Sequence, residues 1–147
     1  TKRTLTVVFH STTAAASLPV VLASDYIPLG GYSIFRSLDL DETEEAVKAT
    51  AGQLYKLRIT NNATSARYVK FYNDTTANVV VGTTVPVDTI PIPPASAAGN
   101  PTVLTESYGP AGAAYSVAIT AAATTGLADN DTGAPAANDI VITAFYK

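Results

Sequence analysis

The sequence predicts an all-β fold: an antiparallel β-sandwich of the jelly-roll or Greek-key type, with an extended N-terminal arm. Strand signals recur at short intervals from about residue 45, with turn-forming Asn, Asp, Gly and Pro between them. Charged residues make up only 14% of the 147 residues and hydrophobic residues 47%, a balance that favours a packed core over disorder. No segment has the length and periodicity that would predict a helix.

The N-terminal part of the chain differs from the rest in where its proline and glycine residues lie. Pro19 and the adjacent Gly30 and Gly31 favour extended chain and turns over the interior of a sheet. Residues 1–45 are therefore interpreted as an arm or a subsidiary β unit, and residues 46–147 as the sandwich domain. The alternative is that residues 1–45 are the ordinary first half of a single sandwich.

The segment 54–60 alternates between apolar and polar side chains, as a strand with one buried and one wet face does. Its expected apolar side consists of Tyr55, Leu57 and Ile59. Its expected wet side consists of Lys56, Arg58 and Thr60.

A turn over residues 61–65 is expected to join this strand to a second one over residues 66–73, so that the two form a hairpin. In the second strand, the expected apolar side consists of Val69 and Phe71. The expected opposite side consists of Tyr68, Lys70 and Tyr72.

The remaining strands are expected on the same grounds at 45–50, 79–81, 87–92, 102–107, 113–120 and 140–146. Four prolines place the middle of this set at sheet edges or in connections: Pro86, Pro91, Pro93 and Pro94. Three alanines at 121–123 favour a helix by propensity, but the Thr-Thr-Gly that follows ends it at once. The terminal strand is expected to pair into the sheet and complete the sandwich.

Two separate segments of the chain resemble structural proteins of tailed-bacteriophage virions. Residues 17–25, SLPVVLASD, are similar to a phrase of that family, although Tyr26 stands where the family usually has Gln. Residues 128–147, ADNDTGAPAANDIVITAFYK, resemble the C-terminus of small virion proteins. Phrases between them, such as ARYVKFYN at 66–73, look familial too.

The resemblance implies a non-enzymatic virion structural protein, and most specifically a capsid cement or decoration protein that bridges capsid subunits on the capsid surface. The implied partners are the major capsid protein and copies of the chain itself, as a trimer or a dimer. The alternative is a tail-associated or fibre-associated module that binds host-surface carbohydrate.

The expected interface combines apolar arm residues, tyrosines and two acidic residues near the C-terminus. It consists of Leu18, Pro19, Val20, Val21, Leu22, Tyr26, Tyr32, Tyr68, Tyr72, Asp129 and Asp131. Tyrosine suits an interface because its ring buries area while its hydroxyl tolerates water. The low charge of the chain is also typical of a protein that buries much of its surface against other subunits.

No catalytic, cofactor-binding or metal-binding residues are expected. His10 is the only histidine and cysteine is absent, which excludes the usual zinc sites and leaves a Ser-His-Asp triad without context. The loop beginning at Asp129 resembles a calcium loop only superficially, since Ala134 and Ile140 occupy the sixth and twelfth positions of an EF-hand. It is interpreted as an Asx/Gly turn.

The densest charge cluster is acidic and consists of Asp39, Asp41, Glu42, Glu44 and Glu45. A solvated loop is the ordinary interpretation of such a run. A second hypothesis is that it meets basic side chains of a neighbouring subunit, among them Arg36, Arg58 and Arg67. The net charge of −3 without a basic stripe argues against nucleic acid as a partner, and short, interrupted apolar runs predict no membrane span.

Overall fold

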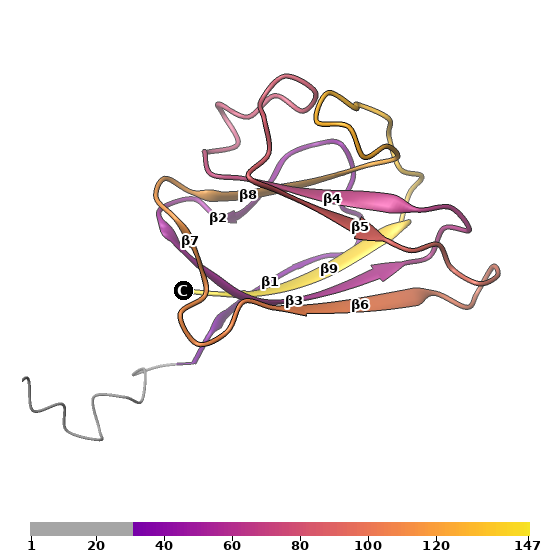
Figure 1. The fold of residues 1–147 in the computed structure, drawn as a ribbon, viewed down its shortest axis with the longest axis horizontal. Coiled ribbons are helices and arrows are strands. Elements are labelled where there is room, and N and C mark those ends of the chain that lie inside the picture. The colour runs from indigo at the N-terminus through magenta and orange to yellow at the C-terminus, as the bar shows by residue number, and fades with distance from the viewer. Residues whose placement is uncertain (1–30) are drawn as a thin grey trace, which may run out of the picture. The chain divides into compact units, whose positions relative to one another are not determined.

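The computed structural model describes residues 31–147, which form two antiparallel sheets and contain no helix (Figure 1). Sheet A has the order β1 (Ser33–Ser37), β9 (Ile140–Tyr146), β3 (Gly52–Asn61) and β6 (Thr102–Ser107), with β7 (Ala113–Tyr115) also paired to β3. Sheet B has the order β2 (Glu45–Lys48), β8 (Ile119–Thr124), β4 (Arg67–Tyr72) and β5 (Asp88–Ile92). The predicted all-β sandwich is confirmed, whereas residues 1–30 of the predicted arm lie outside the described residues.

The strand pairing is that of a jelly roll. β4 pairs with β5, β3 with β6, β2 with β8 and β1 with β9, all antiparallel. The chain therefore runs as one long hairpin whose two arms are rolled into facing sheets. One consequence is that β9, at the C-terminal end, lies between β1 and β3 in sheet A.

The predicted hairpin over 54–60 and 66–73 is wrong, because β3 and β4 lie in different sheets. Asn61, at the end of β3, is fully buried and holds the crossing between the sheets. Its side-chain Nδ2 donates to the carbonyl oxygens of Ser65 at 3.0 Å and Pro93 at 3.0 Å, and its Oδ1 accepts from the backbone amide of Ala63 at 2.9 Å. These bonds satisfy a buried amide and fix a crossover in place of a hairpin turn.

The sandwich also begins earlier than the sequence predicts. Residues 33–37, which the sequence analysis assigns to the arm, form β1 and pair with β9. Residues 32–147 form one compact unit, so the sandwich starts at Tyr32 and not at residue 46. Only pairing with the distant C-terminal strand makes β1 a strand, and no local signal reports that pairing.

Two further segments differ from the predicted strands. Residues 79–81 lie in a loop and form no strand, and the predicted strand over 113–120 is two strands, β7 and β8. β8 extends through the alanine triplet to Thr124, and all six of its residues are buried. Small side chains fit there because both faces of this strand are covered.

A bulge in β3 changes the predicted face of Tyr55. Leu54 and Leu57 are both fully buried although three positions separate them. The register of β3 against β9 shifts between Leu54 and Lys56, which inserts an extra residue and turns Tyr55 out of the core. The predicted apolar side is therefore right for Leu57 and Ile59 and wrong for Tyr55.

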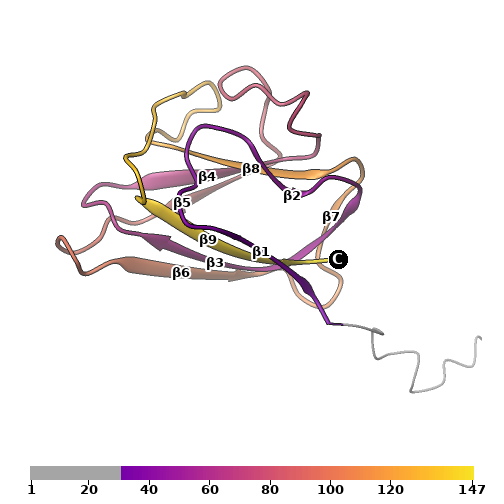
Figure 2. The ribbon, with the colours of Figure 1, turned by 180° about the vertical axis from the view of Figure 1, so that it is seen from behind.

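The main core lies between the sheets, and a second, smaller core lies on the outer face of sheet B. The second core consists of Tyr72, Val79 and Ala122, with Val81 packed against it. The loop after β4 and the loop after β8 lie together over sheet B, on the side away from sheet A (Figures 1 and 2). Lys70 and Tyr72, predicted on a polar face of β4, are therefore fully buried.

The Tyr72 hydroxyl gives a first prediction, because it is buried with no hydrogen-bond partner among the described residues. Burial, with smaller contributions from Glu44 and Asp129, raises the pKa of Tyr72 from 10.0 to about 12. Tyr72→Phe removes an unsatisfied polar atom and keeps the ring, so we expect the free energy of unfolding to rise by about 1 kcal/mol near neutral pH.

The alkaline limb of the stability curve should change as well. The pKa of Tyr72 is higher in the folded chain than in the unfolded chain. The free energy of unfolding therefore keeps its full value below pH 10.0 and falls as pH rises from there through about 12, because the unfolded chain ionises first. Urea unfolding of wild type and Tyr72→Phe across this range should show a shallower alkaline decline in the variant. Tyr68→Phe, in the same strand but half-buried, is the control and should leave both quantities nearly unchanged. A loss of stability in Tyr72→Phe would contradict the prediction.

Candidate functional site

The two sheets differ in how their outer faces are covered. Loops cover sheet B, as described above, but no segment within residues 31–147 covers the outer face of sheet A (Figure 2). The edges differ too. In sheet B, β5 contains Pro91 and β2 is a four-residue strand with a register irregularity, features that discourage further strand pairing. The edge strands β1 and β6 of sheet A contain no proline.

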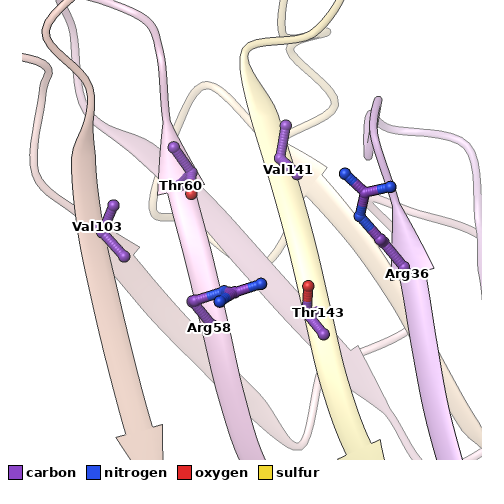
Figure 3. Close-up of a pocket in the computed structure, with 6 residues that line it drawn as sticks. All are labelled: Arg36, Arg58, Thr60, Val103, Val141 and Thr143. Carbon is purple, nitrogen blue, oxygen red and sulfur yellow. The ribbon is translucent and has the colours of Figure 1, made fainter.

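The centre of the outer face of sheet A is a row of side chains across three strands. Arg36 of β1 lies opposite Thr143 of β9, and Thr143 lies opposite Arg58 of β3. The two arginines flank a shallow depression with a volume of about 340 Å³ (Figure 3). Its lining consists of Arg36, Arg58, Thr60, Val103, Val141 and Thr143.

This face is positively charged although the chain carries a net charge of −3. Lys56 lies one row away from Arg58, opposite Phe145, and the registered positions of the face include no carboxylate. Within residues 31–147, neither Arg36 nor Arg58 forms an ion pair. We call these three basic residues and the apolar residues around them the cationic face.

The other basic side chains of the described residues have partners within the chain. Arg67 is paired with Asp139 at 2.6 Å, and Lys48 donates to the carbonyl oxygen of Ala51 at 2.6 Å. Lys147 lies 5.9 Å from the centre of the Tyr32 ring. Among residues 31–147, positive charge without a partner therefore collects on the cationic face.

Apolar side chains accompany this charge. Ile34 is 62% exposed and Val103 is 56% exposed, and both lie on the cationic face. Ile34 is opposite Phe145, which is half-buried. Arginine combined with exposed apolar and aromatic side chains is typical of protein–protein contacts.

The predicted interface residues that the structure describes do not gather in one place. Leu18, Pro19, Val20, Val21, Leu22 and Tyr26 lie outside the described residues. Tyr32 is half-exposed, and its ring lies 4.7 Å from that of Tyr55. Tyr68 is half-buried in β4. Tyr72 is covered completely, which leaves it no surface to offer a partner.

The predicted acidic contacts lie in the loop over sheet B. Asp129 is exposed, whereas the Oδ1 of Asp131 accepts hydrogen bonds from the amides of Gly126 and Gly133, both at 3.0 Å. Asp131 therefore shapes its own loop.

The side chain of Lys70 in β4 forms hydrogen bonds to the backbone of this loop. Its Nζ donates to the carbonyl oxygens of Ala128 at 2.7 Å and Asp131 at 3.2 Å. Burial lowers the pKa of Lys70, and the nearby carboxylates of Asp131 and Asp129 oppose that shift only in part. The loop is therefore an integral part of the sandwich, which agrees with its interpretation as a turn.

The acidic cluster is partly engaged in local hydrogen bonds. Asp41 accepts from the amide of Thr43, Glu44 from the amide of Val81, and Glu45 from the hydroxyl of Ser37. No three acidic or histidine side chains within the described part of the chain are grouped so that they could hold a metal ion. None of the same residues forms a helix that could cross a membrane.

Arg36 and Arg58 are possible basic partners from the sequence, but the sequence does not place them together. Alternation over 54–60 predicts that Arg58 lies on a solvent-facing side. It does not predict that β9 lies between β3 and β1, which is what brings Arg58 and Arg36 into one row. Arg67, named with them, lies in sheet B with its own partner.

Comparison of the chain with protein-family models, with curated proteins and with solved structures gives no match.

Proposed function

We propose that this chain is a non-enzymatic structural protein of a tailed-bacteriophage virion, and more narrowly a capsid cement or decoration protein. In this proposal it lies on the capsid surface and bridges copies of the major capsid protein. The resemblances at residues 17–25 and 128–147 support the virion assignment.

The observation that carries the proposal is the difference between the two sheets. Sheet B is covered by its own loops, while the outer face of sheet A carries exposed apolar side chains and basic side chains that form no ion pair within residues 31–147. Exposed apolar patches of this kind mark interaction sites more often than they occur by chance. A protein that binds the assembled shell better than free subunits stabilises the shell by mass action.

A carbohydrate-binding tail or fibre module is the second candidate, and a different feature favours it. The ring of Tyr32, which is 49% exposed, pairs with the ring of Tyr55, which is half-buried, and the Tyr55 hydroxyl donates to the Oε1 of Gln53 at 3.2 Å. Aromatic faces beside amide groups can stack on and hydrogen-bond to sugars. Jelly rolls occur in both capsid proteins and lectins, so the fold alone supports either candidate.

Binding of the purified chain to empty shells and to isolated tails tests the proposal. We expect co-sedimentation with shells up to saturation. Ile34→Asp with Val103→Asp should weaken this binding at least tenfold, because each buries a charge in the contact. Val85→Asp, a 69% exposed position in the loop over sheet B, is the matched control and should bind as wild type does. Binding to tails alone, with competition by soluble glycans, would favour the second candidate and contradict the first.

A further inference from the structure

We propose that the cationic face is the docking site for the acidic segment 39–45 of a second copy of this chain. The inference rests on the proposed function and deepens it: the open face of sheet A joins copies of the protein, so a variant of this face binds the shell less tightly because it no longer attaches as an assembly. It is carried by the complementarity of two features that the fold places on the same chain but does not join.

The first feature is the paired arginine row. Neighbouring strands are about 4.8 Å apart, so Arg36 and Arg58 start about 10 Å apart on either side of Thr143. A carboxylate above Thr143 can accept hydrogen bonds from both guanidinium groups, and such charge-assisted bonds are among the strongest in proteins. The side chains of Val103 and Val141 border the same depression and limit its hydration (Figure 3).

The second feature is the density of carboxylates in the segment 39–45, which carries five of them. Glu42 makes no hydrogen bond to residues 31–147, and Asp41, Glu44 and Glu45 each use only one oxygen in the bonds described above. A carboxylate has several acceptor positions, so these groups keep capacity for a partner.

The segment does not reach the cationic face of its own chain. The amide of Leu40 donates to the carbonyl oxygen of Ile140, and the carbonyl oxygen of Asp41 accepts from the amide of Ala123. These bonds attach the segment to the ends of β9 and β8 and carry it toward sheet B (Figure 2). A contact between the two features therefore has to form between chains.

Residues 1–30 do not complement the charge of the cationic face. Residues 1–30 contain two basic residues, Lys2 and Arg3, and one acidic residue, Asp25. This segment cannot neutralise three positive charges, whereas the segment 39–45 can. Because docking site and docked segment are different surfaces, the contact can form twice in a two-fold dimer or once per subunit in a closed ring, the dimer and the trimer that the resemblance implies.

Sedimentation of the purified full chain in low salt and in about 0.5 M salt tests the inference, since salt screens exposed ion pairs. We expect wild type to self-associate in low salt and to dissociate in high salt. The face variant Arg36→Glu/Arg58→Glu and the segment variant Glu42→Lys/Glu44→Lys should each raise the dissociation constant at least tenfold, because each places like charges in contact.

Mixing the two variants should restore association, because the reversed face of one then meets the reversed segment of the other. Lys48→Glu/Lys147→Glu changes the net charge as the face variant does but lies off the face, so it should associate as wild type does. Circular dichroism of each variant reports whether it is folded.

Two outcomes would overturn the inference. One is a wild type that stays monomeric at all concentrations in low salt. The other is a mixture that associates no better than its components. The experiment contains no shells, so its failure counts against this contact and not against shell attachment.

Discussion

Ile142→Ala should lower the free energy of unfolding by about 3 kcal/mol, because it removes a fully buried side chain and leaves a cavity where the two sheets meet. Ile142 lies in β9, opposite Ser37 of β1 and Ile59 of β3. A strand with partners on both sides cannot relax outward to fill the space, so the loss should lie well inside the range for core truncations.

Val141→Ala is the matched control, since it is the neighbouring position of the same strand on the half-buried outer face. We expect a loss below about 1 kcal/mol there. Urea unfolding followed by tyrosine fluorescence measures both variants. Equal losses at the two positions would mean that β9 does not have the faces described, and no loss at Ile142 would mean that β9 is not central to the core.

The terminal strand shows what sequence reasoning could establish. Residues 140–146 are β-branched and aromatic, follow a turn-forming loop, and were predicted as a paired strand. Alternation likewise located β3, β5 and β6 to within a few residues. Local pattern predicts a strand well when one of its faces meets a core and the other meets water.

The partners of these strands could not be predicted in the same way. A jelly roll pairs strands that are far apart in the chain, such as β1 with β9. The residue pattern of a single sequence does not indicate which distant strands pair with each other. Two strand signals separated by the short, mostly polar segment 61–65 therefore predict a hairpin. What separates β3 from β4 is the buried amide of Asn61, whose partner Pro93 is distant in sequence.

The candidate site could be predicted only in part, for the same reason. Arg58 was placed correctly on a wet face, but its row with Arg36 requires β9 between them. Lys70 looked equally wet from alternation, because the loop that covers it is folded over sheet B from much later in the chain. The loop that covers sheet B, and not the strand pattern, makes Lys70 buried while Arg58 stays at the surface.

The ion pair between Arg67 and Asp139 provides the second large effect. Both Nε and Nη2 of Arg67 donate to Oδ2 of Asp139, at 2.9 Å and 2.6 Å, and the two side chains are 12% and 13% exposed. The same oxygen accepts from the amide of Ala136 at 2.9 Å. The pair therefore links β4 of sheet B to the residue that precedes β9 of sheet A.

Asp139→Ala should lower the free energy of unfolding by about 3 kcal/mol, because it leaves a mostly buried guanidinium group without its partner. Asp129→Ala removes an exposed carboxylate from the same long loop and should cost less than about 0.5 kcal/mol. Chemical denaturation near neutral pH measures the two variants side by side.

Arg67→Met combined with Asp139→Ala should recover part of that loss, since the double variant buries no unpaired charge. The single variant Arg67→Met completes the comparison. If the loss in the double variant equals the sum of the losses in Arg67→Met and Asp139→Ala, the two residues act independently, which would contradict the linkage. A loss smaller than that sum would mean that Arg67 stabilises the junction between the sheets. It would then be unavailable to an acidic partner, and the arginines of the cationic face would be left to bind one.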